Sequence, residues 1–268
     1  MAMTLEIRNL SVNFHGVGLG LQVVRGVCLR LPPGQRASLV GESGCGKTVL
    51  AMALLGLLPQ NARISGEAFF GDWNLLDPPA TARLRGKEIA ICWSNAERYF
   101  NPVLPVGPQI AEAYLQHHPG RRREARQRTL ELLQGMGFAD PLRVWKARPF
   151  QLSGGMNQRA MIAMSVINEP RLLFVDEPTR GLDDDNWERV VDCLLRLNGM
   201  SLFIITHDLR LVRRAGGWLY FMRGGRLVAG GSCPDLLNHP PPGYVSDLVR
   251  SASGWFRDTT AEVCRGRT

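Results

Sequence analysis

The sequence lacks the paired cysteines, long apolar runs and repeats that mark several classes of protein. Its six cysteines, at positions 28, 45, 92, 193, 233 and 264, form no Cys-x-x-Cys pair, so we expect reduced cytosolic thiols and neither a zinc site nor a redox couple. Every apolar run is far shorter than the roughly 20 residues that a membrane-spanning helix needs. Residues 1–8 include the charged Glu6 and Arg8 and no apolar signal-peptide core, which predicts a protein that is not exported.

The composition that is present is typical of a folded domain. Of the 268 residues, 45% are apolar and 21% are charged, which excludes a disordered or low-complexity chain. The 32 Lys and Arg residues outnumber the 24 Asp and Glu residues, for a net charge of +8. This excess favours an anionic neighbour such as nucleotide, lipid headgroups or nucleic acid.

Hydrophobic patterning predicts an α/β fold with an N-terminal β portion. Short β-type runs broken by Gly and Pro occupy residues 5–12, 23–31 and 37–40. The apolar run 48–55 predicts a buried helix. We therefore expect a strand-rich, largely antiparallel opening.

The second half of the chain alternates strands with helices. Fully apolar runs at 172–175 and 202–206 are separated by a helical segment at 187–197, which is typical of a mainly parallel sheet covered on both faces. Prolines between residues 95 and 110, followed by an amphipathic helix at 121–135, predict a helical insertion.

These patterns predict one domain with an inserted part. We place the core at residues 1–92 and 165–268, and the α-helical subdomain at about 93–164. The expected fold class is thus α/β, a phosphate-loop NTPase core with an inserted helical subdomain.

A phosphate-binding loop follows the strand predicted at 37–40. The pattern G-x-x-x-x-G-K-[ST] lies between a predicted strand and a predicted helix, where backbone N–H groups and the helix N-terminus can surround phosphates. Its lysine can reach the β- and γ-phosphates, and its threonine hydroxyl can bind Mg²⁺. We predict that the loop binds a nucleoside triphosphate. Its residues are Gly41, Glu42, Ser43, Gly44, Cys45, Gly46, Lys47 and Thr48.

An acidic pair follows the apolar run 172–175. Asp176 can hold Mg²⁺ through water, and Glu177 can act as general base toward an attacking water. The alternative is a pair that only caps the strand. Beside a phosphate loop, two consecutive carboxylates favour hydrolysis over binding alone.

Ser153, Gly154 and Gly155 open a predicted helix and can bind a second anion. With the segment 152–159, the chain resembles the ATP-binding subunits of ABC transporters over essentially its whole length. The resemblance implies the ABC ATPase fold, ATP and Mg²⁺ as ligands, and a signature motif that binds the γ-phosphate held by the opposite subunit. Each site then needs two chains, so isolated monomers are expected to be poor ATPases.

The resemblance also assigns roles to three scattered residues. Asp183, in Gly-Leu-Asp, is similar to the loop that touches the partner's site. His207 is similar to the switch histidine that contacts the γ-phosphate, although a lone histidine at a strand end can also be structural. Phe14 is the candidate for stacking on adenine, with core packing as the alternative. The implied catalytic residues are Glu177, His207 and Lys47, and the implied metal ligands are Thr48 and Asp176.

Two further segments, 100–102 and 238–244, resemble the oligopeptide, dipeptide and nickel importer branch. That branch implies import of a peptide, nickel or a metal chelate, powered from the cytoplasmic face of the inner membrane. The implied partners are two integral membrane permease subunits, an extracytoplasmic solute-binding protein and a second ATPase subunit, identical or not. The cargo itself is not encoded in this chain.

Ser94 departs from the family pattern. The family places a glutamine there, which senses Mg²⁺ and the attacking water, and a serine hydroxyl stops well short of that reach. We expect slow hydrolysis or altered coupling at this site. A locally shifted loop, or compensation elsewhere, is the alternative.

The cysteines and the basic clusters carry further expectations. Cys45 lies at a helix N-terminus, which lowers the pKa of a thiol, so it is either a reactive group or a small residue that fits the turn. Cys264 alone lies in the tail, which predicts no iron–sulfur cluster. Arginines at 121–123 and at 210, 213 and 214 are read as solvated helix faces, or as contacts with anionic lipid or an acidic permease loop. No motif predicts nucleic-acid binding.

The sequence also allows two alternatives to an importer. One is the ATPase of a soluble enzyme complex of the carbon–phosphorus lyase type, which shares the motifs of this branch. The other is a weakly active regulatory half of an asymmetric ATPase pair, supported by Ser94 alone. The nature of the partners separates the first alternative from an importer.

Overall fold

The computed structural model describes residues 3–16 and 20–252, so Cys264 lies outside the described residues. Within them the chain forms two sheets and a group of helices. No helix in these ranges is both long enough and apolar enough to cross a membrane.

The N-terminal sheet has four antiparallel strands in the order β2-β1-β4-β5. Its strands are β1 (Leu5–Phe14), β2 (Leu21–Leu31), β4 (Ala62–Phe70) and β5 (Trp73–Asn74). In β1 the buried side chains of Leu5, Ile7 and Val12 lie on the inner face. This one-sided burial is what an antiparallel sheet with one solvated face requires.

The central sheet has six strands in the order β10-β9-β3-β8-β7-β6. They are β3 (Arg36–Val40), β6 (Ile89–Cys92), β7 (Leu172–Asp176), β8 (Ser201–Thr206), β9 (Trp218–Arg223) and β10 (Arg226–Ser232). All pairings are parallel except that of β10 with β9. The carboxyl ends of β3, β7 and β8 therefore meet at one edge of the sheet.

The central sheet is buried on both faces, which explains its continuous apolar runs. Along β7, Leu172 and Phe174 pack into the core shared with the N-terminal sheet. Leu173 and Val175 pack into a second core, formed with the helices. A strand between two cores needs apolar side chains at every position, and this is the pattern that the sequence contains.

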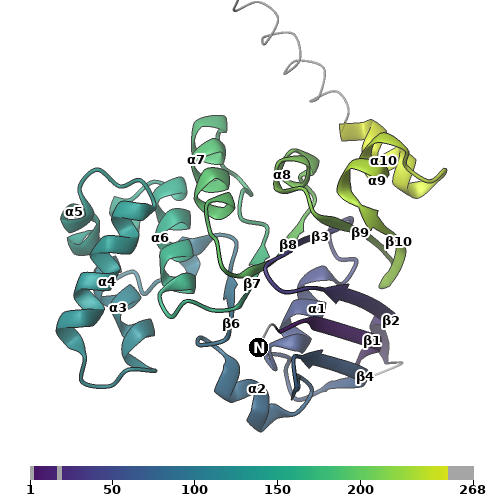
Figure 1. Ribbon diagram of the computed structural model, residues 1–268, viewed down its shortest axis with the longest axis horizontal. Helices are drawn as coiled ribbons and strands as arrows, with labels where there is room; N and C mark the ends of the chain where they lie inside the picture. The colour runs from purple at the N-terminus through teal and green to yellow at the C-terminus, as the bar shows by residue number, and fades with distance from the viewer. Residues whose placement is uncertain (1–2, 17–19, 253–268) are drawn as a thin grey trace, which may run out of the picture.

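Ten α-helices and two short 3₁₀ turns lie in the described ranges. The helices are α1 (Lys47–Leu54), α2 (Pro78–Leu84), α3 (Val106–Leu115), α4 (Arg122–Gly135), α5 (Pro141–Lys146), α6 (Gly154–Val166), α7 (Asp184–Leu195), α8 (Leu209–Ala215), α9 (Cys233–Asn238) and α10 (Tyr244–Ala252). The turns are η1 (Ala96–Arg98) and η2 (Pro149–Gln151). In Figure 1, α3 to α6 lie together on the side of the molecule opposite the N-terminal sheet.

The helix α6 joins that helical group to the central sheet. Gln158 donates to the backbone oxygen of Trp93 at 2.9 Å, and Ser165 donates to that of Ile91 at 3.0 Å. Arg159 is buried as well and donates to the Met136 backbone oxygen at 2.8 Å. Hydrogen bonds from these polar side chains thus link α6 to the edge strand β6 and to the C-terminal end of α4.

The expected α/β class and its strands at 37–40, 172–175 and 202–206 are confirmed to within one residue at each end. Helix α7 begins three residues before the predicted 187, because Asp183 caps it. The strands β4, β9 and β10 were not predicted. The apolar residues of β4 and β10 are interrupted by Gly or Arg, so these two strands carry no clear period, whereas β9 is a short apolar run without such interruption.

Candidate functional site

The phosphate loop lies between β3 and α1, as the motif requires. Gly46 has φ +107°, and a Cβ there would lie 2.8 Å from the Val23 backbone oxygen. Only glycine fits such a left-handed position beside neighbouring backbone. The Gly225 N–H donates to the Cys45 oxygen at 3.1 Å, which holds the far side of the loop against the β9–β10 turn.

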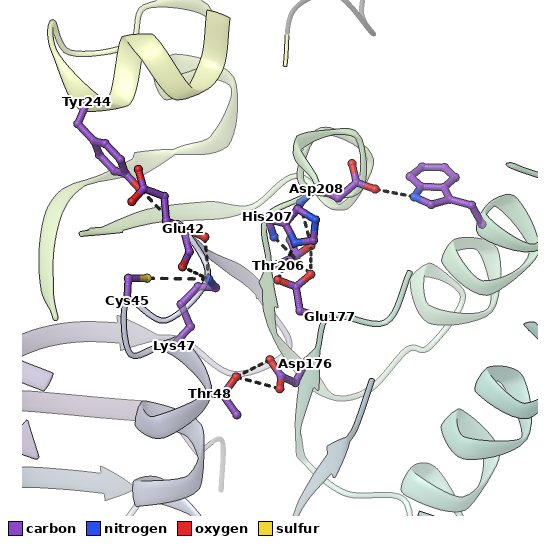
Figure 2. Close-up of polar contacts among 12 residues, drawn as sticks. Glu42, Cys45, Lys47, Thr48, Asp176, Glu177, Thr206, His207, Asp208 and Tyr244 are labelled. Carbon is purple, nitrogen blue, oxygen red and sulfur yellow. Dashed lines mark hydrogen bonds and ion pairs between the residues drawn. The ribbon is translucent and has the colours of Figure 1, made fainter. Parts of the chain in front are cut away.

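Lys47 is folded back onto its own loop. Its ammonium nitrogen Nζ donates to the backbone oxygens of Gly41 at 2.7 Å and Glu42 at 2.8 Å, and the side chain is buried (Figure 2). A phosphate seated in the loop would offer charged oxygens in place of these carbonyls. The cation is thus already held where the phosphate would bind.

Thr48 and Asp176 face each other across the loop and the end of β7. The Thr48 hydroxyl lies 3.1 Å and 3.0 Å from the two carboxylate oxygens, as Figure 2 shows. Burial raises the pKa of Asp176, and the charge of Glu177 raises it further, while the Thr48 hydroxyl and Lys47 oppose the shift. The site therefore holds a poorly solvated carboxylate that would gain from a cation.

Glu177 is held in a strained backbone conformation, with φ +46°. Its N–H donates to the Ile205 oxygen at 2.8 Å, and its carboxylate accepts from the Thr206 hydroxyl at 3.2 Å. His207 Nδ1 lies 2.8 Å from the same carboxylate, and the imidazole is exposed. A carboxylate aimed out of the sheet edge beside an exposed imidazole suits proton abstraction from a bound water.

The signature residues lie at the start of α6. The Ser153 hydroxyl accepts from the Met156 N–H at 3.2 Å and so caps the helix. A Cβ on Gly155 would lie 2.3 Å from Asn186 Oδ1, so α6 and α7 touch where only glycine fits. Asp183 caps α7 by accepting from the Asn186 N–H at 2.8 Å.

Phe14 and Ser94 lie outside these contacts, and Cys45 lies within them but differs from the expectation. Phe14 ends β1 and packs, half-buried, against the core of the N-terminal sheet. Ser94 is half-buried in the bend after β6, where the rings of Trp93 and Tyr99 stack at 5.4 Å. The lowered pKa expected of Cys45 is wrong: burial raises the pKa of its thiol, and Lys47 opposes this only in part.

The arginines on α8 do not form a solvated basic face. Arg210 lies 3.2 Å from Asp184, and Arg214 lies 2.7 Å from Asp192 and contacts Glu188. These carboxylates come from α7, so the two helices neutralise each other. The sequence reading missed this pairing because residues more than 20 positions apart supply it.

Residues that the sequence reading missed also surround the site. Trp187 Nε1 donates to Asp208 Oδ2 at 2.7 Å, next to His207. The Tyr244 hydroxyl, from α10, accepts from the Glu42 N–H at 3.3 Å and donates to the Met222 oxygen at 3.4 Å (Figure 2). Neither contact has a local sequence signal. The candidate tail motif at 238–244 is the one hint that Tyr244 matters.

Curated relatives of this chain are named as transport ATP-binding proteins. A 37% identical relative, the dipeptide transport ATP-binding protein DppD of Haemophilus influenzae, aligns over 92% of this chain and 77% of its own. The Escherichia coli DppD is 34% identical over 95% of this chain and 80% of its own. The oligopeptide transport ATP-binding protein OppD of Mycobacterium tuberculosis is 37% identical over 94% of this chain, but only 42% of its own length is covered.

Solved structures show the fold. The dimeric, ADP- and Pi-bound ATP-binding cassette MJ0796 superposes with a TM-score of 0.75 over 85% of this chain and 98% of that one, at 24% identity. The cbiO1 subunit of the Clostridium perfringens cbiONQ transporter complex gives a TM-score of 0.75 over 94% and 95%, at 20% identity. The family model described as "ABC transporter" matches residues 24–180, more than half of the chain. The chain therefore belongs to the ABC transporter family, as an ATP-binding subunit whose ATP hydrolysis is coupled to transport.

Proposed function

We propose that this subunit powers an importer for peptides or related solutes, from the cytoplasmic face of the membrane. The relatives named for dipeptide and oligopeptide transport support peptide cargo over nickel or metal chelates. They also favour a transporter over a soluble enzyme complex. The observation that carries hydrolysis is the Glu177 carboxylate, which contacts Thr206 and His207 beside the Thr48–Asp176 pair.

The geometry supports the catalytic roles that we propose. Glu177 is the general base, because its carboxylate lies 2.8 Å from the exposed His207 at the sheet edge and its side chain keeps 14% exposure, which leaves it open to a water. Lys47 stabilises negative charge on the transferring phosphoryl group, and His207 does so from the end of β8, which lies between β3 and β7. The loop Gly41–Thr48 holds the phosphates, and Phe14 is retained as the candidate for adenine stacking.

The residues present fit a magnesium ion. Thr48 and Asp176 place a hydroxyl and a buried carboxylate together, which are the hard oxygen donors that Mg²⁺ prefers. No cluster of three or more His, Cys, Asp or Glu within residues 3–16 and 20–252 could hold a metal by itself. Phosphate oxygens and water would supply the other ligands. When bound, the ion neutralises charge that develops on the phosphoryl group.

We infer that a complete site takes two chains. The signature helix α6 packs among α3, α4 and α7, whereas α1 packs under the N-terminal sheet, so the two anion-binding helix ends belong to different halves of the chain (Figure 1). Ser153, Gly154 and Gly155 would then contact the triphosphate of a partner ATPase, with Asp183 nearby. The partner can be a second copy or a related subunit.

The permease contact is placed on the inserted helical subdomain, at about residues 93–164. Exposed apolar side chains are concentrated there, at Tyr99, Val103, Leu104 and Phe150. Arg148 donates to the Val103 oxygen at 3.2 Å, which brings the segment before α3 next to the one before α6. Exposed apolar side chains in such numbers are typical of a protein contact. A solute-binding protein would deliver cargo to the far side of the permeases.

A serine at position 94, where the family has a glutamine, supports slow hydrolysis or altered coupling. A glutamine amide extends two bonds further than a serine hydroxyl and can reach a ligand that serine cannot. We predict that Ser94→Gln raises the ATPase rate of the assembled complex about threefold or more. Steady-state hydrolysis at saturating ATP is the measurement, with Ser94→Ala as the matched control at an unchanged rate. An unchanged rate for Ser94→Gln contradicts the idea.

The decisive test of the proposed function is recovery of the partners. The chain is purified by affinity from detergent-solubilised native membranes in ATP, and the bound proteins are identified by mass spectrometry. Two multi-spanning proteins and a second ATPase are the expected result. Recovery of soluble enzymes alone would overturn the importer assignment.

A further inference from the structure

Trp187 is a buried aromatic with a hydrogen bond that the proposed mechanism does not use. It lies in the first turn of α7 and is only 4% exposed. Its indole nitrogen donates to Asp208 Oδ2 at 2.7 Å. Figure 2 labels Asp208 and draws this bond as a dashed line. A buried N–H to a carboxylate is a strong, directional contact. Its loss leaves Oδ2 without the indole donor, while Oδ1 still accepts from the Arg210 backbone N–H at 2.9 Å.

Two arginines hold the indole in place. The guanidinium carbons of Arg210 and Arg214 lie 4.8 Å and 5.7 Å from the ring centre. Both side chains also form ion pairs with acidic residues of α7. Cation–π contacts and ion pairs together fix the angle between α7 and α8 around this ring.

From Asp208 the hydrogen bonds lead directly to the candidate general base. The Asp208 N–H donates to the Thr206 hydroxyl at 3.0 Å, and that hydroxyl donates to Glu177 at 3.2 Å. His207 lies between Thr206 and Asp208 in the sequence, and its Nδ1 lies 2.8 Å from the Glu177 carboxylate. Trp187 is thus connected to Glu177 by three consecutive hydrogen bonds.

The same first turn of α7 also reaches the signature helix. Asn186, the residue before Trp187, is held by Asp183 through both its backbone N–H and its side-chain amide, each at 2.8 Å. Gly155 packs directly against Asn186. One short segment therefore contacts the start of α6 and, one residue later, the loop that carries His207.

We propose that Trp187 is a positioning residue for hydrolysis. Its hydrogen bond fixes the Asp208 carboxylate, and through Asp208 it orients Thr206 and His207 toward Glu177. Because Trp187 follows Asn186, it also connects these residues to Asp183, which caps α7. The role in catalysis rests on the proposed function. The role in orienting His207 rests on the contacts above alone, so the two can be tested separately.

The test compares two variants and one control in the full-length chain. Trp187→Phe keeps an aromatic ring but removes the N–H donor. Asp208→Ser keeps a good cap for α8 but cannot reach the indole. Trp218→Phe is the matched control, since Trp218 is 44% exposed on β9.

The first readout is the imidazole signal of His207 in long-range ¹H–¹⁵N NMR, assigned with His207→Gln. Both test variants are expected to shift it toward the values of a free histidine, while the control leaves it in place. The second readout is Mg·ATP hydrolysis and ATP affinity. We expect kcat to fall about fivefold or more in each test variant, with Kd for ATP within twofold. The double variant should lose no more than either single one.

The outcomes separate the two proposals. An unchanged His207 signal in Trp187→Phe and Asp208→Ser overturns the positioning role. Additive losses of kcat in the double variant overturn it as well, because independent defects add. If the His207 signal responds but the wild-type chain neither binds nor hydrolyses ATP, the positioning role stands and the proposed function fails.

Discussion

Asp176 lowers the stability of the folded chain and at the same time supplies a carboxylate to the site. Its carboxylate is buried at the end of β7, and Thr48 is its hydrogen-bonding partner in the described site. Burial is the main cause of its raised pKa, with the Glu177 charge second. An ionised group in that position destabilises the chain until a cation binds.

We therefore predict that Asp176→Asn stabilises the nucleotide-free chain at neutral pH. A raised pKa means that the unfolded state releases the proton first, so the stability held by the protonated form is lost as pH rises through the raised value. The variant removes that loss. We expect about 1 kcal/mol, or a Tm higher by about 2–4 °C, at pH 7.5.

Thermal unfolding between pH 4 and 8 measures this effect. The difference between variant and wild type should shrink as the pH falls into the usual range of aspartate, because both then carry a neutral group. Asp72→Asn, in the exposed β4–β5 turn, is the control and should move Tm by under about 1 °C. A variant less stable than wild type at pH 7.5 would show that the Thr48 contact outweighs burial.

At the scale of elements, the two glycines at the start of α6 provide a matched pair. A Cβ on Gly154 would meet only Leu182 Cδ2 at 3.8 Å, an ordinary contact, whereas on Gly155 it would lie 2.3 Å from Asn186. Neither has a positive φ. The two positions therefore differ in space and not in backbone conformation.

We predict opposite effects on stability. Gly154→Ala should gain up to about 1 kcal/mol from helix propensity. Gly155→Ala should lose about 1–3 kcal/mol, because α6 and α7 must separate or Asn186 must abandon Asp183. Urea unfolding of the isolated chain gives both numbers. Equal stability of the two variants would mean that the α6–α7 contact is loose.

Sequence patterns predicted the elements that end in polar residues and missed the contacts between them. Asp176 and His207 were placed correctly at strand ends because an apolar run stops there. Trp187 and Tyr244 were not predicted, since their partners lie on other elements and leave no local periodicity. The same is true of the raised pKa of Cys45: the helix N-terminus is visible in sequence, but the burial is not.

For the whole molecule, the arginine clusters at 121–123 and 210–214 offer lipid less positive charge than their number of arginines suggests. Arg210 and Arg214 are paired with α7, and Arg121 lies 3.3 Å from Glu124. Exposed ion pairs of this kind add little stability. They do reduce the positive field, so apolar contact is the stronger basis for docking on a permease.

A site formed by two chains can be tested with two variants that damage opposite sides of it. Lys47→Ala removes the cation from the phosphate loop but keeps the signature helix. Ser153→Asp keeps the cap of α6, since Asp is as good a cap as Ser, but presents a negative charge to the partner's phosphate. Each variant alone should hydrolyse ATP about 100-fold more slowly than wild type.

Mixing the two variants should restore activity. Half of the dimers that form at a one-to-one ratio carry one chain of each kind, and each such dimer contains one site with an intact Lys47 opposite an intact Ser153. We expect recovery to roughly a quarter of the wild-type rate, falling with dilution because the site exists only in the dimer. Steady-state phosphate release over a range of protein concentrations measures both effects, and Lys47→Ala mixed with buffer is the control. Wild-type activity proportional to protein concentration, with no recovery on mixing, would place the complete site in one chain; recovery only after adding a second ATPase would instead assign the partner to a related subunit.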